Sequence, residues 1–195
     1  MTTIHLIRHG DVHNPRKILY GRLPRFRLSE QGRQQAEAAA AYLQDRPLAA
    51  IISSPRLRAR QTAALIAARH PGVPVRYSTL IDEVLSPHQG RPIAELDAEG
   101  WRLYEAVPPG YETPDDVLAR ARRLLDRLRR EYDGHEVAVV SHGDVVLALH
   151  CWVQGRPFND ETKKEAVYPA TASVTTLGFL NGETAPRMFR YHRPY

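Results

Sequence analysis

Short apolar runs alternate along the chain with segments in which apolar residues return every three or four positions. Strand-like runs cover Ile4–Arg8, Ala49–Ile52, Val73–Tyr77 and Glu136–Val140. Continuous apolar runs of this length are typical of strands buried on both faces of a sheet. Their alternation with helical segments predicts an α/β fold.

Two helices are expected in the first third of the chain. Ser29 is a typical N-cap, and the alanine-rich segment after it keeps the spacing of one buried face up to Pro47. Ser54 followed by Pro55 predicts an N-cap with proline at the first helical position, and the helix should continue to about Arg69.

A long irregular segment follows, over Thr79–Pro114, with one weak helix near Ile93–Leu103. Segments of this kind are usually functional or cover a site. A capping box then predicts a helix from Thr113 to about Tyr132. The residues expected on its inner face are Val117, Ala121, Leu124 and Leu128. Nearer the C-terminus, a helix is expected over Val145–Trp152.

The last two apolar runs predict an antiparallel pair of strands. Ala172–Leu180 should pair with Arg187–His192 across a hairpin turn at Asn181-Gly182.

The tetrapeptide His-Gly-Asp-Val occurs twice, at His9–Val12 and His142–Val145, each time directly after a strand-like run. Glycine after each histidine allows the backbone to turn sharply. Ligands of open α/β sheets bind beyond the carboxyl ends of the strands. If the two strands are neighbours, the two imidazoles therefore face each other across one shared site.

Charge favours an anionic partner. Lys and Arg number 27 against 22 Asp and Glu, a net charge of +5. This balance suits small anions or a nucleic acid backbone. Many of the arginines lie on the predicted helix Thr113–Tyr132, where no aromatic residues alternate with them. We interpret that run as a solvated helix face and expect no nucleic acid partner.

Length and cysteine usage give further expectations. The 195 residues fit a single domain covering residues 1–195. Cys151 is the only cysteine, so no intramolecular disulfide can form, as is usual in a reducing cytosol. There is no N-terminal signal pattern, and no apolar stretch approaches the roughly 20 residues that span a bilayer. We expect a soluble, cytoplasmic protein without a membrane partner.

Arg8-His9 at a strand end suits chemistry at phosphorus. Neutral imidazole is a nucleophile near pH 7, and guanidinium binds phosphoryl oxygens in a bidentate fork. Arg58 falls in the first turn of a predicted helix, where free N–H groups and the helix dipole already favour an anion.

Three motifs in order resemble the histidine phosphatase superfamily, with its phosphoglycerate-mutase-like fold. They are Leu6–Gly10, Ser53–Ala63 and Ser141–Gly143, and the resemblance covers nearly the whole chain. It implies a three-layer sandwich: a mostly parallel central sheet with helices on both faces. It also implies no metal, no cofactor, a phosphohistidine intermediate on His9, and a phosphate pocket completed by Arg8, Arg58 and His142.

The family usually places an acidic proton donor in the excursion after the third strand. Glu83 fits the Leu-x-x-Glu pattern found there, and Asp82 is the alternative. We expect desolvation and a neighbouring phosphate to raise the pKa of the donor carboxyl, so that it can protonate the leaving alkoxide. His142 is expected to be cationic when phosphate is bound.

Two departures from the family pattern affect the site. The usual Arg-His-Gly-Glu ends here in Asp11, which we interpret as structural. The asparagine that often follows comes early, as Asn14, and we expect it to contact phosphate. Family members contact phosphate or substrate from the following loop, which makes Tyr20, Gly21 and Arg22 candidate substrate contacts.

His5, His9 and His13 recur every four residues, a spacing that groups metal ligands on a helix but not on a strand. We therefore expect no metal. The function that fits best is a metal-independent phosphatase acting on a small phosphorylated metabolite. Sugar, nucleotide-derived and cofactor-precursor phosphates remain open as substrates, as do phosphohistidine proteins.

Two alternatives remain. A phosphoglycerate mutase would use the same pocket, although mutases of this fold resemble longer chains with extra segments that seal the pocket. A non-catalytic module that binds a phosphorylated ligand would keep the fold alone.

Overall fold

Six strands form one mixed sheet in a computed structural model that describes residues 1–195. The strand order is β3-β2-β4-β1-β5-β6. Neighbours among β3, β2, β4 and β1 run parallel, whereas β5 is antiparallel to both β1 and β6. The strands are β1 (Thr2–Arg8), β2 (Leu48–Ser53), β3 (Val75–Tyr77), β4 (Glu136–Ser141), β5 (Val174–Phe179) and β6 (Met188–His192).

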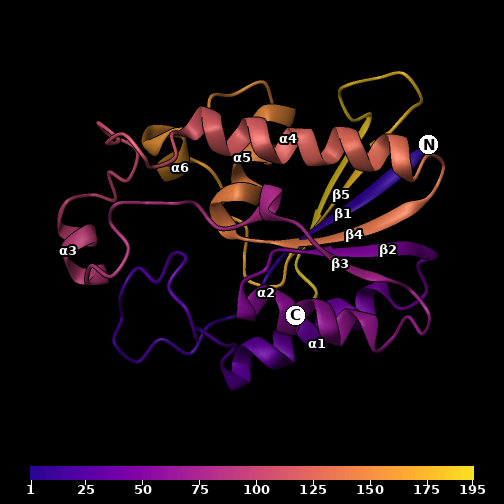
Figure 1. The fold of residues 1–195 in the computed structure, drawn as a ribbon, viewed down its shortest axis with the longest axis horizontal. Coiled ribbons are helices and arrows are strands. Elements are labelled where there is room, and N and C mark those ends of the chain that lie inside the picture. The colour runs from indigo at the N-terminus through magenta and orange to yellow at the C-terminus, as the bar shows by residue number, and fades with distance from the viewer.

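Helices cover both faces of this sheet, which confirms the predicted α/β fold (Figure 1). The pair α1 (Glu30–Leu43) and α2 (Leu57–Ala67) packs on one face, where Ile7, Ile51 and Val140 are buried. The pair α4 (Pro114–Glu131) and α5 (Gly143–Val153) packs on the other face, with Leu6 and Val139. Successive strand residues thus alternate between two cores, as the pleat requires. None of the helices is both long and apolar enough to cross a lipid bilayer.

The capping residues predicted from the sequence give the start of α1 but not that of α2, and α5 begins at Gly143, two residues earlier than predicted. Ser29 caps α1 by accepting a hydrogen bond from the Gly32 N–H, and α1 ends before Pro47 as predicted. The predicted start of α2 at Pro55 is wrong, because the helix begins at Leu57 after an extended Arg56. The Ser54 hydroxyl does not cap α2 and instead donates a hydrogen bond to Asp82.

The long helix and the C-terminal strands agree closely with the sequence pattern. Thr113 and Asp116 form the reciprocal capping box of α4. β5 and β6 pair as predicted, but the connection over residues 180–187 is longer than a tight Asn-Gly turn. β3 begins at Val75, two residues later than predicted.

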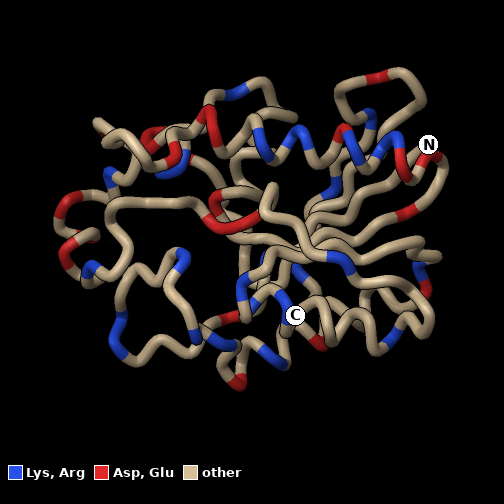
Figure 2. The backbone as a smooth tube through the Cα atoms, in the orientation of Figure 1, with Lys and Arg blue, Asp and Glu red and all other residues tan.

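The predicted irregular segment projects beyond the carboxyl edge of the sheet. It contains a 3-10 turn (Thr79–Ile81) and a single short helix, α3 (Ile93–Ala98), which ends earlier than the sequence predicted. Figure 1 shows α3 and the unpredicted helix α6 (Asp160–Glu165) at this end of the molecule. Lys and Arg positions recur in the loop between β1 and α1 and along α4 (Figure 2).

The two His-Gly glycines are required by close packing, which corrects their predicted role in a sharp turn. Neither Gly10 nor Gly143 has a positive φ angle. A Cβ on Gly10 would lie 2.2 Å from the carbonyl oxygen of Gly32 in α1. A Cβ on Gly143 would lie 2.3 Å from the hydroxyl of Tyr168. Each glycine therefore allows another segment to approach the end of a central strand.

Candidate active site

The two repeated histidines come together at the carboxyl edge of the sheet. β1 and β4 are parallel neighbours with Arg8 opposite Ser141, so the residue after each strand reaches the same level. The rings of His9 and His142 lie 5.2 Å apart between centroids. The prediction that the two strands are neighbours and bring the two imidazoles together is confirmed, although His142 does not itself line the cavity described below. That the two histidines serve one functional site stays a prediction.

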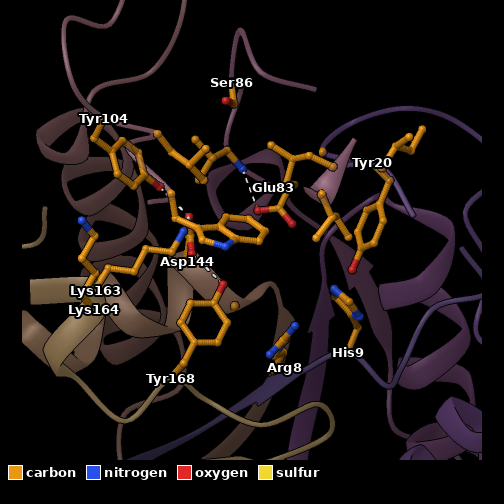
Figure 3. Close-up of a pocket in the computed structure, with 18 residues that line it drawn as sticks. Arg8, His9, Tyr20, Glu83, Ser86, Tyr104, Asp144, Lys163, Lys164 and Tyr168 are labelled. Atoms are coloured by element: carbon orange, nitrogen blue, oxygen red, sulfur yellow. Dashed lines mark hydrogen bonds and ion pairs between the residues drawn. The ribbon is translucent and has the colours of Figure 1, made fainter. Parts of the chain in front are cut away.

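A cavity of about 470 Å³ opens beside these strand ends (Figure 3). Arg8 and His9 lie at its sheet end, and Glu83 approaches them from the irregular segment. Residues of α6 and of the loop after it complete the far side. The polar residues that line it are Arg8, His9, Glu83, Ser86, Asp144, Lys163 and Lys164, together with Tyr20, Tyr104 and Tyr168.

The hydrogen bonds of His9 determine which of its two ring nitrogens carries the proton. Its Nδ1 lies 2.7 Å from the carbonyl oxygen of Gly10 and therefore donates, so that Nε2 is the unprotonated nitrogen and carries the lone pair. That lone pair accepts a hydrogen bond from the Arg58 Nε at 3.1 Å. Burial and the positive charge of Arg58 hold the pKa of His9 well below its ordinary value, so the imidazole is neutral.

Arg58 is the centre of the hydrogen-bond network. Its side chain is 1% exposed, although it carries a permanent charge. Its NH2 group lies 3.1 Å from both Glu83 Oε2 and His142 Nδ1, and 2.8 Å from the Gly21 carbonyl. The first turn of α2 thus supplies a fixed cation between the candidate nucleophile and the candidate acid.

His142 is fixed by a chain of hydrogen bonds that leads away from the cavity. Its Nε2 lies 2.7 Å from the Ser54 hydroxyl, which itself donates to Asp82 at 3.1 Å. Because the hydroxyl proton is used, Ser54 accepts from His142, and the Nδ1 of the neutral ring is left unprotonated toward Arg58 and Glu83. Burial lowers the pKa of His142, although Glu83 partly opposes this effect.

Glu83 lines the cavity, and its carboxyl is ionised in the ligand-free site. Burial acts to raise the pKa of Glu83, yet His142 and Arg58 outweigh it and hold that pKa well below its ordinary value. Desolvation thus acts in the expected direction but does not determine the net shift, and the rise expected beside a bound phosphate stays a prediction. Asp82 does not line the cavity, and Arg56 binds both of its carboxylate oxygens.

Arg8 has donors available for an anion. Its NH1 donates to the Pro169 carbonyl at 2.6 Å, and its guanidinium lies 5.0 Å from the centre of the Tyr168 ring. Its Nε is buried and has no hydrogen-bond partner. A buried donor without a partner is costly unless a ligand satisfies it, and Arg8 lines the cavity.

Of the three candidate substrate contacts in the loop after β1, two line the cavity and one does not. Tyr20 and Gly21 line the cavity, and the Tyr20 ring lies 4.6 Å from the Arg58 guanidinium. Arg22 does not line it, because its side chain donates to the Glu83 carbonyl and pairs with Glu112. It lies behind the segment that carries Glu83.

Asn14 and Asp11 are both engaged within the protein. The structure does not bring Asn14 to the cavity, since its amide bonds both the N–H and the carbonyl of Ile18. Asp11 accepts from the Ser29 hydroxyl at the start of α1.

Several lining residues were missed by sequence reasoning. Trp101 and Tyr104 lie in the irregular segment, and Lys163, Lys164 and Tyr168 follow the long loop after α5. No local motif marks them, because tertiary packing alone brings these segments over the strand ends. Asp144 belongs to the repeated His-Gly-Asp-Val, and the second copy of that motif could have indicated it.

One group of side chains has the spacing of metal ligands. Donor atoms of His9, Glu83 and His142 lie within 4.8 Å of one another. However, all three accept from or face Arg58, whose positive charge opposes a cation at that point. His5 bonds Thr176 and Glu136, and His13 is exposed, so the histidines spaced by four residues do not converge.

Comparison with known families agrees with this geometry. The family model of the histidine phosphatase superfamily (branch 1) matches residues 4–191. An uncharacterized protein of Mycobacterium tuberculosis is 40% identical over 184 residues, covering 90% of this chain and 89% of that protein. The glucosyl-3-phosphoglycerate phosphatase of the same species is 35% identical over 200 residues, covering 93% and 86%.

A solved structure extends the similarity to three dimensions. The native structure of a mycobacterial glucosyl-3-phosphoglycerate phosphatase superposes with a TM-score of 0.78 at 29% identity. The match covers 97% of this chain and 96% of that one.

Proposed function

The chain belongs to the histidine phosphatase superfamily and is a phosphatase, and from this premise we propose that it hydrolyses a small phosphomonoester through a phosphohistidine on His9. One observation carries the proposal. His9 is buried and neutral, it lines the cavity next to Arg8, and its unprotonated Nε2 bonds the Arg58 guanidinium. A neutral imidazole beside two guanidinium groups combines a nucleophile with anion binding.

The first step forms a bond between the His9 Nε2 and phosphorus while the ester P–O bond breaks. Negative charge spreads over the three equatorial oxygens, and the positive charges of Arg8, which lines the cavity, and Arg58, which bonds His9, stabilise it. The leaving oxygen takes a proton from Glu83. In the second step Glu83 accepts a proton from water, whose oxygen attacks phosphorus, and His9 is released together with inorganic phosphate.

Substrate binding must change the protonation of the two groups that face Arg58. In the ligand-free site Glu83 is ionised and the pKa of His142 is lowered by burial. An entering phosphate brings like charge to Glu83 and opposite charge to His142, which raises the pKa of both. We propose that the bound state contains protonated Glu83 as donor and cationic His142 as a stabiliser of the phosphoryl oxygens.

His9→Ala tests the nucleophile. Removing a covalent nucleophile should lower kcat by several orders of magnitude, whereas retention of more than about a tenth of the wild-type kcat would overturn the assignment. The matched control is His13→Ala, because His13 is exposed and lies outside the cavity. Release of inorganic phosphate from p-nitrophenyl phosphate measures both variants.

The same assay tests metal independence and separates the alternatives. Activity should survive EDTA, and vanadate or phosphate should compete with substrate. Loss on chelation that added Mg²⁺ or Zn²⁺ restores would contradict the metal-free mechanism. A mutase would isomerise 3-phosphoglycerate instead of releasing phosphate from it, and a binding module would release none from any ester.

A further inference from the structure

The cavity is much larger than a phosphoryl group. Its volume of about 470 Å³ lies in the range of pockets that enclose ligands with many non-hydrogen atoms. The phosphate end contains Arg8 and His9, and the remainder extends toward the irregular segment and α6 (Figure 3). We call this remainder the leaving-group compartment. Its walls include Ile18, Leu19, Val84, Ile93, Trp101 and Leu103.

The polar side chains of the leaving-group compartment are largely bonded to one another. The carboxylate of Asp144 accepts from the Tyr104 hydroxyl at 2.8 Å, from the Tyr168 hydroxyl at 2.6 Å and from the Lys163 ammonium at 2.8 Å. Figure 3 shows this group converging on Asp144. Both carboxylate oxygens and both hydroxyl protons are therefore used, and the tyrosines offer ring surface to a ligand.

Glu83 and Tyr20 line the cavity near its phosphate end, where both lie against Arg58. Beyond them, two other polar side chains line the leaving-group compartment. The Ser86 hydroxyl already accepts from the His88 N–H, and Lys164 is exposed at the rim. A leaving group rich in hydroxyls would lose its hydration and find few partners there, which costs free energy. An apolar or aromatic leaving group has no hydrogen bonds to water to lose, and its burial against the apolar walls is favourable.

Trp101 is held in an unusual conformation at this wall. Its φ angle is 54°, in the left-handed region that a bulky side chain rarely adopts. The indole N–H donates to Asp97, and the backbone N–H groups of Leu103 and Tyr104 donate to Asp160 of α6. These bonds fix the Trp101 loop against α6 and keep the indole at the cavity.

We propose that the leaving-group compartment selects phosphomonoesters whose alcohol carries an aromatic or extended apolar body that packs on Trp101. This inference rests on the proposed phosphatase function and names the substrate class of the same site. Large apolar alcohols should be preferred over small alcohols and over sugars of similar size.

Three esters of primary alcohols test the preference while keeping the leaving oxygen chemically similar. They are ethyl phosphate, 2-phenylethyl phosphate and glucose 6-phosphate. Burial of a phenyl group should raise kcat/KM for 2-phenylethyl phosphate about 10- to 150-fold over ethyl phosphate. Glucose 6-phosphate should fall well below 2-phenylethyl phosphate. If ethyl phosphate equals 2-phenylethyl phosphate, or glucose 6-phosphate is the best of the three, the inference is overturned.

Variants of Trp101 test whether this side chain causes the preference for the phenyl group. In Trp101→Ala the ratio of the two kcat/KM values, 2-phenylethyl over ethyl, should fall about tenfold, whereas Trp101→Phe should keep most of it. Tyr77→Ala is the control, since this aromatic side chain is exposed on β3 and does not line the cavity. An unchanged ratio in a folded Trp101→Ala protein would contradict the role of the indole.

The three wild-type rates also distinguish a failure of the proposed substrate class from a failure of the proposed phosphatase mechanism. Phosphate release that depends on His9 without an apolar preference would leave the phosphatase mechanism intact and refute only the substrate class. No release from any of the three esters would contradict both.

Discussion

At the scale of single residues, the Ser54 hydroxyl decides which nitrogen of His142 carries a proton in the neutral ring. It accepts from the His142 Nε2 and donates to Asp82, and Asp82 is held in turn by Arg56. The Nδ1 therefore faces Arg58 and Glu83 and is the nitrogen that takes up the proton in the proposed mechanism. Ser54 acts through His142 and is a positioning residue.

Ser54→Ala should lower kcat and kcat/KM together, by about 10- to 150-fold. A hydrogen bond to a charged group contributes about 1.5–3 kcal/mol, and in the proposed mechanism His142 is charged only when phosphate is bound. Ser54→Thr keeps the hydroxyl and should restore most of the rate. A rise in KM at unchanged kcat in Ser54→Ala would argue against this role, because it would show uniform binding instead of support for the reacting state.

Glu83→Gln should slow poor leaving groups more than good ones. An alkoxide needs the proton of a general acid far more than p-nitrophenolate does, so turnover of an alkyl phosphate should fall by about 10² to 10⁴. Turnover of p-nitrophenyl phosphate should fall much less. Asp82→Asn is the comparison, and it should slow both substrates alike because Asp82 acts through Ser54 and Arg56. Selective loss in Asp82→Asn would move the proton donor to that residue.

At the scale of elements, two glycines join β1 to α1. A Cβ on Gly32 would lie 2.0 Å from the Asp11 carbonyl oxygen, and one on Gly10 would meet the Gly32 carbonyl. Both obstacles are backbone atoms, which cannot rotate away as a side chain can. This close approach fixes the start of α1 behind the loop that leaves His9.

Gly32→Ala should therefore destabilise the protein, although the same change usually stabilises a helix interior by about 1 kcal/mol. Overpacking of this kind costs about 1–3 kcal/mol, so the free energy of unfolding should decrease. Glu37→Ala, at an exposed position of the same helix, should stay within about 0.5 kcal/mol of wild type. Urea unfolding measures the stability of both variants. A gain in stability for Gly32→Ala would show that the backbone between β1 and α1 can move to make room for the methyl group.

The elements near the strand ends could be predicted from the sequence where neighbouring residues alone determine where a helix or strand begins. Ser29 and the Thr113 capping box gave the starts of α1 and α4, and apolar runs gave the central strands. The start of α2 was missed because Ser54 bonds Asp82 and lies under His142, contacts distant in sequence. Asn14 was misplaced for the same kind of reason, since its amide closes a local turn with Ile18.

At the scale of the whole molecule, much of the positive charge is used internally. On α4, Arg120 pairs with Glu112, Arg127 with Glu131, and Arg129 with Asp126, while Arg122 lies over the Trp152 ring. The exposed Arg127–Glu131 pair contributes little stability, whereas Arg120 and Arg129 are mostly buried, and all three pairs leave fewer free cations for a polyanion. This distribution supports the interpretation of α4 as a solvated face.

Buried neutral histidines couple the stability of the whole fold to pH. Burial lowers the pKa of His150 to about 4, and its Nε2 lies 2.8 Å from the Thr175 hydroxyl on β5. The pKa values of His5, His9 and His142 are lowered as well. In the unfolded chain these groups titrate near 6.5.

The sign of the effect follows from proton uptake. Between pH 6.5 and about 4 the unfolded state binds a proton at His150 and the folded state does not, so stability falls as pH falls. From pH 6.5 to pH 5 the His150 contribution lost is about 2 kcal/mol. Stability from Asp82 and Glu83 persists over this range, because their pKa values are lowered and both stay ionised.

His150→Gln isolates this residue from the other histidines. Glutamine can still bond Thr175 but does not titrate, so the free energy of unfolding of the variant should decrease less between pH 7.5 and pH 5.0. Urea unfolding of both proteins at the two pH values gives a double difference of about 2 kcal/mol, in which the contributions of the remaining histidines cancel. Equal losses in the two proteins would show that His150 is protonated in the fold, and the pH dependence would then belong to the other buried histidines.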